Sequence, residues 1–151
     1  MHFMIAVLDY GMGNLRSVSK ALEFLGGRVQ VTSDPAQIRA CDKLVLPGVG
    51  AFGDAAAELK ARGLWEPALE HIRAGKLFLG ICLGLQLLLP ESEESPGVAG
   101  LGIFPGKVVR FRSQGIKIPH MGWNQVDFQG SHPLMAGVPS KKFLRMVRPA
   151  S

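Results

Sequence analysis

The fold of this chain is decided by the stretch Leu77-Phe78-Leu79-Gly80-Ile81-Cys82-Leu83-Gly84-Leu85-Gln86. Its apolar first half predicts a buried strand, and the pattern from Leu85 to Leu89 predicts a helix. Between them, Gly80 to Gly84 reads G-x-C-x-G, the cysteine version of the nucleophile elbow, a sharp turn from strand to helix. A side chain at either glycine would clash in so tight a turn. We therefore predict that this turn exposes Cys82 at the end of a strand.

The predicted turn gives Cys82 the setting of a reactive thiol. The Leu83 N–H and the start of the next helix bring partial positive charge beside the sulfur, which favours a thiolate. A thiolate is a nucleophile for acyl transfer. Most free cysteines are instead buried and act as small hydrophobes. We interpret Cys41 in that way, because no glycines frame it.

Strands and helices are predicted to alternate along the chain on the N-terminal side of this turn. We predict strands at Met4–Leu8, Val29–Val31, Lys43–Leu46 and Leu77–Ile81. Helices fit between them: one is capped by Asn14, one by Asp34 before Pro35, and helical patterns run through Leu59 to Ile72. Apolar strands joined by helices pair in parallel through right-handed crossovers. The fold class is therefore α/β, with a mostly parallel central sheet and flanking helices.

The pattern changes after Glu91. Residues Pro90–Gly97 are predicted to form an exposed loop. Three segments then predict antiparallel strands that form a C-terminal extension: Lys107–Phe111, Ile116–Ile118 and Asn124–Phe128. At 151 residues we expect one domain, 1–151.

Composition excludes several classes of protein. Two cysteines without framework spacing argue against a disulfide-stapled secreted protein, and Met1 to Met4 lacks the charged start of a signal peptide. The longest apolar stretch, Leu77–Leu89, is too short to span a bilayer. We therefore expect a cytoplasmic protein with no membrane contact.

The net charge of the chain is +5, and four of the excess cations lie in the C-terminal tail: Lys141, Lys142, Arg145 and Arg148. Because no basic cluster carries interleaved aromatic residues, we expect no nucleic-acid partner.

Polar and glycine-rich loops follow the predicted strands, at the carboxyl ends where α/β proteins bind ligands. These loops are Asp9–Asn14, Pro47–Gly53 and the turn at Cys82. Alone, Pro47-Gly48-Val49-Gly50 would be an ordinary turn, but beside an elbow it becomes a candidate oxyanion hole together with the Leu83 N–H. Gln86, one helical turn after Cys82, either faces the same pocket or is a solvated polar group.

Five motifs together resemble the class I (triad) glutamine amidotransferases, and within them the glutaminase subunits of imidazole glycerol phosphate synthase. They are Asp9-Tyr10-Gly11-Met12-Gly13-Asn14-Leu15, Leu46-Pro47-Gly48-Val49-Gly50, Gly80 to Gln86, Gly100-Leu101-Gly102 and Pro119-His120-Met121-Gly122-Trp123-Asn124. The elbow marks only the broad class, whereas the first and last motifs point to the subunit. The resemblance covers residues 3 to about 138.

The resemblance implies a reaction and a partner. Cys82 would attack the side-chain amide of glutamine, release ammonia and form a thioester that water hydrolyses. The ammonia would pass to a cyclase subunit, a (β/α)₈ barrel in a heterodimer, that makes imidazole glycerol phosphate and aminoimidazole carboxamide ribotide in histidine biosynthesis. No cofactor or metal is expected.

The resemblance also implies roles for particular residues. Gly50 and Leu83 would form the oxyanion hole. Glutamine would bind at Gly48, Val49, Gly50 and Gln86. The cyclase interface would include Met12, Asn14 and Trp123.

The family's catalytic base is a histidine followed two residues later by a glutamate, and none of the four histidines here has that setting. His120, in a proline-framed loop, is interpreted as a structural or interface residue. The tail 140–151 departs from the family pattern, so we expect a truncation or shifted reading frame near Ser140 and a fold incomplete at its C-terminus. Two alternatives stay open: a catalytically impaired binding module of the same fold that lacks the triad His and Glu, and an α/β cysteine enzyme of another class, such as a peptidase or chaperone.

Overall fold

The computed structural model describes residues 3–112, 120–126, 133–138 and 142–148. Contacts divide the chain into two compact units, Met1–Val109 and Arg110–Ala150, which are described separately. The elbow and the two glycine loops all belong to the first unit.

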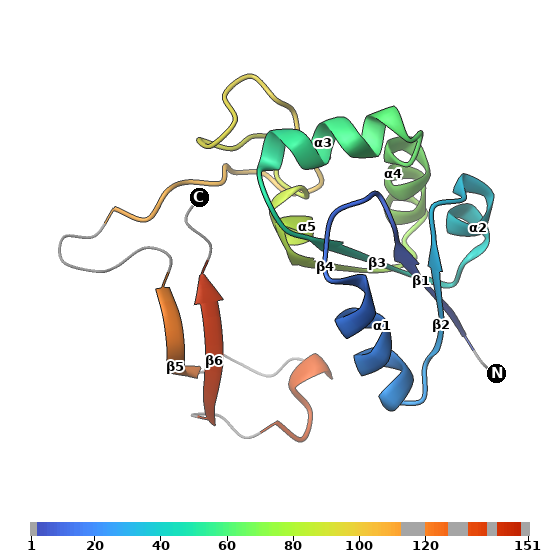
Figure 1. Ribbon diagram of the computed structural model, residues 1–151, viewed down its shortest axis with the longest axis horizontal. Coiled ribbons are helices and arrows are strands. Elements are labelled where there is room, and N and C mark those ends of the chain that lie inside the picture. The colour runs from blue at the N-terminus through green and yellow to red at the C-terminus, as the bar shows by residue number, and fades with distance from the viewer. Residues whose placement is uncertain (1–2, 113–119, 127–132, 139–141, 149–151) are drawn as a thin grey trace. The chain divides into compact units, whose positions relative to one another are not determined.

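The first unit is built on a four-stranded sheet in which every pair of neighbours is parallel (Figure 1). The strands are β1 (Met4–Leu8), β2 (Arg28–Thr32), β3 (Lys43–Gly48) and β4 (Leu77–Cys82), in the spatial order β2-β1-β3-β4. All four strands were predicted from their apolar runs. The structure extends β3 by two residues, to Gly48, and this places Gly48 opposite Cys82 in the ladder.

Helices connect these strands: α1 (Leu15–Phe24), α2 (Pro35–Ala40), α3 (Phe52–Ala61), α4 (Trp65–Arg73) and the single turn α5 (Leu83–Gln86). The predicted caps are confirmed. The Asn14 side chain accepts a hydrogen bond from Ser17 N at 3.2 Å, and Asp34 accepts one from Ala36 N at 2.8 Å. Each satisfies an amide that the first helical turn leaves without a partner.

The core lies between the sheet and the helices α2, α3 and α4, which cover one face of the sheet, while α1 lies on the other face (Figure 1). Leu44 and Leu46 of β3 are fully buried there, and so are Phe52 and Leu59 of α3. Burying one such side chain contributes about 1.5–3 kcal/mol to stability. This packed face anchors the strand ends from which the glycine loops emerge.

The prediction that β4 is a buried strand is wrong on one face. β4 is an edge strand of the four-stranded sheet, and Leu77 and Leu79 are 65% and 49% exposed. Register places both with Val45, on the face where α1 lies, but α1 contacts β1 and β2 instead. An apolar run is compatible with burial on both faces of a strand. It does not reveal whether another element covers each face.

The second unit contains a pair of antiparallel strands, β5 (His120–Val126) and β6 (Lys142–Arg148), and a short 3₁₀ turn at Pro133–Met135. These two strands form a separate two-stranded sheet, and of the predicted antiparallel strands only Asn124–Phe128 is matched, in part, by β5. No strand was predicted for 142–148. The strand predicted at Ile116–Ile118 lies outside the described residues.

The strand predicted at Lys107–Phe111 is wrong. Only Val108 forms a bridge there, and it runs parallel to Ser92. Val108 uses both of its backbone groups on that contact: its N–H donates to Glu91 O and its carbonyl accepts from Glu93 N, each at 2.9 Å. The segment therefore closes the loop that follows α5 instead of extending a sheet.

Candidate active site

Cys82 has the strained backbone that a nucleophile elbow requires. Its φ is 56° and its ψ is −113°, and it is the only non-glycine residue with positive φ in the part of the chain that the structure describes. Such a conformation costs on the order of 1–3 kcal/mol and persists only where the surroundings enforce it. The turn leaves the Cys82 thiol exposed at the carboxyl end of β4.

Both elbow glycines are required by close backbone contacts, as the G-x-C-x-G pattern predicted. A Cβ on Gly80 would lie 2.6 Å from the Gly84 carbonyl oxygen, and a Cβ on Gly84 would overlap the Leu46 carbonyl oxygen. Neither neighbour is a flexible side-chain end that could move aside. The two glycines therefore let α5 pack directly on β3 and β4 and hold Cys82 at the turn.

The glycine loop after β3 lies beside the elbow. Gly48 is buried and pairs with Cys82 in the parallel ladder, whereas Val49 is 52% exposed and Gly50 has a φ of +91°. The loop thus leaves the sheet at the level of the thiol and turns in a left-handed conformation that favours glycine. The loop therefore lies beside Cys82 in the sheet, and the oxyanion hole of Gly50 and Leu83 stays a prediction.

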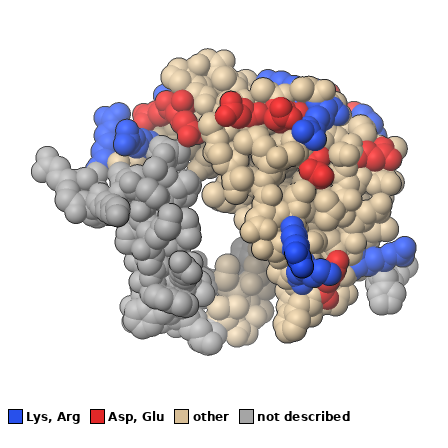
Figure 2. Space-filling view, in the orientation of Figure 1, with Lys and Arg blue, Asp and Glu red and all other residues tan. Residues whose placement is uncertain are grey.

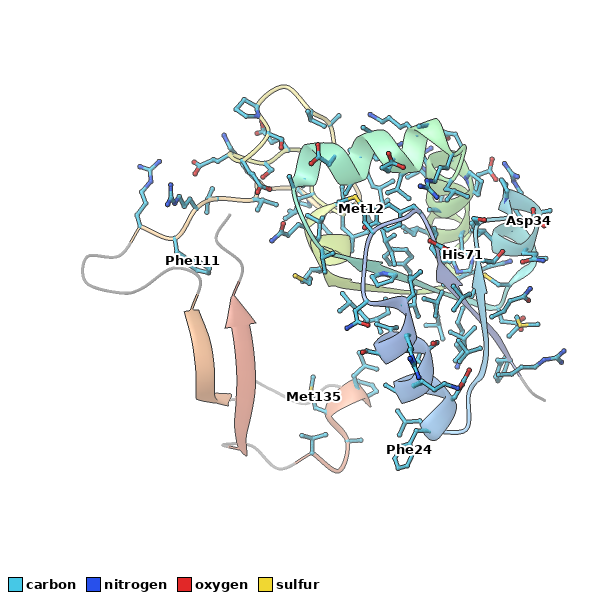
Figure 3. The ribbon with its side chains drawn as sticks, in the orientation of Figure 1. Met12, Phe24, Asp34, His71, Phe111 and Met135 are labelled. Atoms are coloured by element: carbon cyan, nitrogen blue, oxygen red, sulfur yellow. The ribbon has the colours of Figure 1, made fainter. Side chains whose placement is uncertain are left out.

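The third loop predicted for this end of the sheet, Asp9–Asn14, reaches the same place. The Met12 Cε atom lies 2.9 Å from the position that a Cβ on Gly50 would take, and a Cβ on Gly13 would lie 3.3 Å from Pro47. Met12 sits at the end of the sheet that holds α5 (Figure 3). Strand ends separated by many residues in the sequence are therefore assembled around Cys82 as parallel topology predicted.

The helix after Cys82 ends three residues earlier than predicted. The sequence pattern predicted a helix from Leu85 to Leu89, but α5 covers four residues, and the next residues form turns. Gly100 N donates to Pro90 O at 2.9 Å and Leu101 N donates to Leu87 O at 2.7 Å, so the following segment folds back at once. One turn carries a much smaller dipole than a long helix, so the Leu83 N–H beside the thiol matters more than the dipole. Gln86, the last residue of α5, is half-buried.

The loop Pro90–Gly97 was predicted as an exposed loop, and the structure gives it a further contact. Glu94 Oε2 accepts a hydrogen bond from Phe52 N at 3.0 Å, and Ser95 Oγ accepts one from Gly53 N at 2.9 Å. The residue at the N-cap position, Ala51, has no side chain that could do this. The loop therefore caps α3, the helix that begins directly after the candidate oxyanion loop.

The predicted interface residues have different surroundings. Met12 is half-buried against the glycine loop, and the Asn14 side chain caps α1, so each also has a structural role within its own loop. Trp123 lies in β5, where it pairs with Arg145. Its assignment to a partner interface stays a prediction.

His71 is excluded as the base for Cys82 by its place in the fold. It is 3% exposed, and its Nε2 donates to the Leu77 carbonyl at 3.1 Å, at the start of β4. Strands rise about 3.3 Å per residue, so the length of β4 separates this site from Cys82 by roughly 16 Å. Figure 3 shows His71 toward α2 and α4. Burial lowers the pKa of His71 and raises that of Cys41, whose Sγ lies 3.7 Å from His71 Nδ1.

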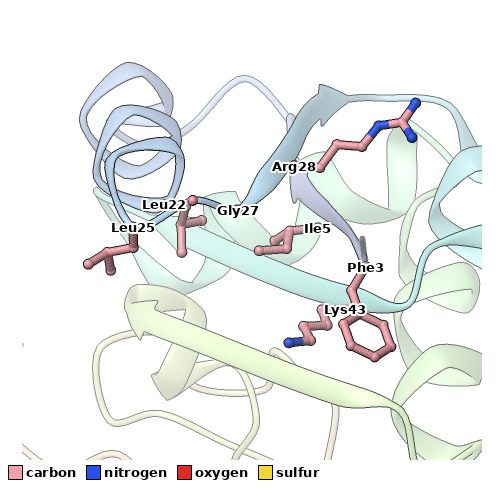
Figure 4. A pocket seen from close by; sticks show the side chains of 8 residues that line it. Phe3, Ile5, Leu22, Leu25, Gly27, Arg28 and Lys43 are labelled. Atoms are coloured by element: carbon pink, nitrogen blue, oxygen red, sulfur yellow. The ribbon is translucent and has the colours of Figure 1, made fainter. Parts of the chain in front are cut away.

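A hollow in the surface of the first unit lies away from this end of the sheet. It has a volume of about 270 Å³ and lies between α1 and the first residues of β1, β2 and β3, at the opposite ends of the strands (Figure 4). On the face shown in Figure 2, Lys and Arg side chains are interspersed with Asp and Glu. Within the described ranges, no cluster of His, Cys, Asp and Glu could hold a metal ion, and no helix has the length and apolar character to cross a membrane.

Tyr10 is a residue of this site that the sequence marks only as part of a motif. Its side chain is fully buried, and its hydroxyl oxygen lies 2.7 Å from the position that a Cβ on Gly48 would take. A tyrosine at the end of a buried strand carried no signal of its own, because only the fold brings it beneath the glycine loop.

Comparison with known proteins agrees with this geometry. The sequence pattern of the family described as glutamine amidotransferase class-I matches residues 6–147. The imidazole glycerol phosphate synthase subunit HisH of Syntrophotalea carbinolica is 55% identical over 143 residues, which cover 91% of this chain and 69% of that protein. The subunit HisH of Methanothermobacter thermautotrophicus is 54% identical over 140 residues, covering 93% of this chain and 69% of that protein.

A solved structure shows the same fold. A crystal structure described as a glutamine amidotransferase superposes with a TM-score of 0.73 over 95% of this chain and 70% of that chain, at 19% sequence identity. At that identity the likeness shows the fold alone, and the assignment rests on the sequence relatives. The chain belongs to the class-I glutamine amidotransferase family and, within it, to the family of the imidazole glycerol phosphate synthase subunit HisH.

Proposed function

We propose that this chain is the glutamine-hydrolysing subunit of an imidazole glycerol phosphate synthase, acting in histidine biosynthesis. The observation that carries the proposal is the strained, exposed Cys82 opposite Gly48, at the carboxyl ends of β4 and β3. The HisH relatives, each named as a synthase subunit, support the same function. A cytoplasmic location and a single domain over 1–151 stay predictions from the sequence.

The site supports an acyl-transfer sequence in which glutamine is the substrate. The Cys82 sulfur attacks the side-chain amide carbon, forming a C–S bond and placing negative charge on the amide oxygen. Amides of Leu83 and Gly50 stabilise that oxyanion, while Gly48, Val49 and Gln86 line the glutamine site. The C–N bond then breaks, the amide nitrogen takes the proton that the thiol has lost and leaves as ammonia, and water cleaves the thioester to give glutamate and the Cys82 thiol.

The ammonia is proposed to pass to a cyclase subunit in a heterodimer. Met12, Asn14 and Trp123 are the residues proposed for that interface. The subunit names of the relatives support a complex, and the barrel-shaped cyclase follows from the resemblance of the motifs.

A non-catalytic binding module is the less favoured function. A module that only docked a partner would gain nothing from holding a cysteine at a φ of 56°, because the strain lowers stability without improving a distant interface. The two elbow glycines, whose replacement would disturb backbone contacts, help to keep that conformation.

Glutamate release measures the proposed function directly. The 151 residues contain no His-x-Glu sequence, so we expect slow release that depends on Cys82, orders of magnitude below that of an enzyme with a complete triad. The measurement compares the chain with Cys82→Ser, each with and without a purified cyclase subunit. Equal release by both would rule out the proposed function. Fast, partner-stimulated release would show that His120 or a partner group supplies the base.

A further inference from the structure

The Tyr10 hydroxyl is a buried donor without a partner. Its side chain is 0% exposed, and its oxygen is the only buried side-chain N or O atom lacking a hydrogen bond in the portion of the chain that the structure describes. Leaving such a group unsatisfied costs about 1–3 kcal/mol, and native proteins contain few of them. An orphaned hydroxyl of this kind calls for a functional explanation.

The hydroxyl lies where the elbow meets the glycine loop. The point occupied by a Cβ on Gly48 would be 2.7 Å from the Tyr10 oxygen, 2.8 Å from Leu83 Cβ and 3.0 Å from Gly84 N. Tyr10 therefore supports the loop from below, on the side away from solvent. Gly48 has no side chain between the hydroxyl and the loop backbone, so the backbone itself can approach the phenol oxygen.

Tyr10 keeps its proton at neutral pH and can act as a donor. Burial, together with the charge of the nearby Cys82, raises the pKa of Tyr10 to about 12. A neutral phenol presents one O–H donor.

The neighbours of the hydroxyl suggest which acceptor it gains. On the elbow side, the Leu83 carbonyl already accepts one hydrogen bond, from Leu87 N at 3.0 Å. On the other side, the Gly48–Gly50 loop has two glycines and an exposed Val49, and it can adjust its backbone. Hydrogen bonds in enzyme sites are often incomplete without ligand and tighten in the complex.

We propose that Tyr10 is a positioning residue of the Cys82 site, whose hydroxyl donates a hydrogen bond to a backbone carbonyl of the Gly48–Gly50 loop when an acyl group occupies Cys82. The proposal rests on the amidotransferase function proposed above. It explains why a tyrosine stands where phenylalanine would fill the same space without an unsatisfied oxygen. Tyr10 acts through the loop and does not itself touch the substrate.

Two electrophiles separate this role from a general effect on the thiol. Iodoacetamide alkylates a thiolate without needing the glycine loop. A chloroketone analogue of glutamine forms its C–S bond by displacing chloride, and its ketone oxygen takes the place of the amide oxygen, so its reaction uses the loop. Reaction rates at Cys82 are measured by peptide mass mapping for the wild-type chain, for Tyr10→Phe and for the control Thr32→Val. The control removes a buried hydroxyl at the end of another strand, β2, where it is hydrogen-bonded to the Gln37 side chain and to Asp34 N.

Tyr10→Phe is expected to slow the chloroketone about tenfold, the factor that one ordinary hydrogen bond supplies, and to leave the iodoacetamide rate unchanged. Its stability to urea should equal or exceed that of the wild type, because the fold loses only an orphaned oxygen. Thr32→Val should lower stability and change neither rate. Equal slowing by both reagents, unchanged rates with both, or a destabilised Tyr10→Phe would each overturn the role.

Glutamine protection distinguishes this proposal from the function on which it rests. Glutamine should slow the chloroketone at Cys82 of the wild-type chain by competing for the site. If it does not, the amidotransferase function fails and the role of Tyr10 falls with it. If glutamine protects Cys82 and Tyr10→Phe reacts like the wild type, only the role of Tyr10 is wrong.

Discussion

Gly48 and Cys82 occupy paired positions at the carboxyl ends of β3 and β4. Gly48 has no side chain and continues into a loop in which Gly50 is left-handed. Cys82 is held at positive φ by the close contacts of Gly80 and Gly84. A parallel ladder fixes neighbouring strand ends at a nearly constant spacing, so the thiol and the loop amides are placed together by the sheet itself. The site therefore depends on backbone packing, and the glycines are the residues at which that dependence can be measured.

Replacing Gly84 should damage the elbow more than replacing an unconstrained glycine. In Gly84→Ala the new Cβ overlaps the Leu46 carbonyl oxygen, and we expect the free energy of unfolding to fall by about 3 kcal/mol or more. Gly75→Ala is the control: Gly75 has a φ of +72° with nothing within 4 Å, so only backbone strain of about 1–2 kcal/mol applies. Urea unfolding gives both values, and equal losses would contradict the packing argument.

The two thiols should differ in reactivity. Cys82 is exposed at the elbow, whereas Cys41 is 2% exposed and its Sγ donates to the Ile38 carbonyl at 3.1 Å. In the folded chain iodoacetamide should modify Cys82 first, and Cys41 should react only in urea. Peptide mapping identifies the adducts, with Cys82→Ser as the variant that should take up no label while folded. Preferential labelling of Cys41 would show that the elbow is not the reactive site.

The features that depend on neighbouring residues were the most predictable from sequence. Apolar runs located β1 to β4, side-chain caps located the starts of α1 and α2, and the spacing of Gly80, Cys82 and Gly84 predicted the strained turn. These features arise from neighbouring residues, so a local pattern contains their cause. Parallel topology then predicted that the three loops would meet, and contacts of Met12 and Gly13 with the glycine loop confirm it.

What the sequence did not reveal depends on distant partners. The α3 cap comes from Glu94 and Ser95, each 42 residues away in the chain, and no local pattern connects them with Phe52 and Gly53. The exposure of Leu79 depends on which elements cover an edge strand, and the orphaned hydroxyl of Tyr10 depends on what surrounds it. Predicting these features requires the tertiary arrangement itself.

The distant cap of α3 should have a measurable effect. Glu94→Ala and Ser95→Ala each remove the acceptor of one first-turn amide, and we expect each to lower the free energy of unfolding by about 1 kcal/mol. Glu94→Gln keeps an acceptor oxygen and should lose less. Glu91→Ala, at an exposed position in the same loop, is the matched control in the same urea titration. A loss in Glu91→Ala as large as in Glu94→Ala would mean that the cap is not the cause.

Trp123 is expected to anchor the proposed cyclase interface. Large aromatic residues often dominate binding energies, so Trp123→Ala should weaken association with a cyclase subunit by about 2 kcal/mol or more. Titration calorimetry measures the affinity, and circular dichroism checks that the variant stays folded. Phe24→Ala is the control, because Phe24 is 90% exposed on α1 and outside the motifs that resemble interface regions. Unchanged affinity of Trp123→Ala, or its unfolding, would each rule out the interface role.

His71 should make the chain sensitive to acid. It lies on α4 and is buried against the start of β4. Cys41 faces its Nδ1, and Lys76, which donates to the Cys41 carbonyl at 3.0 Å, adds positive charge nearby. Burial is the main reason that the pKa of His71 lies below its ordinary value, and Lys76 contributes in the same direction. Because a carbonyl can only accept, Nε2 carries the single proton of the neutral ring in its bond to Leu77.

The sign of the effect follows from proton linkage. The unfolded chain binds a proton on His71 near pH 6.5, while the folded chain resists protonation until the pH is lower. His71 therefore contributes stability above about pH 6.5 that is lost as the pH falls below it, with a slope of up to about 1.4 kcal/mol per pH unit. In His71→Gln this slope should disappear, while the contributions of the other histidines remain. Urea unfolding of both chains from pH 7 to pH 5 measures the difference, and parallel stability curves would show that His71 is protonated equally in both states.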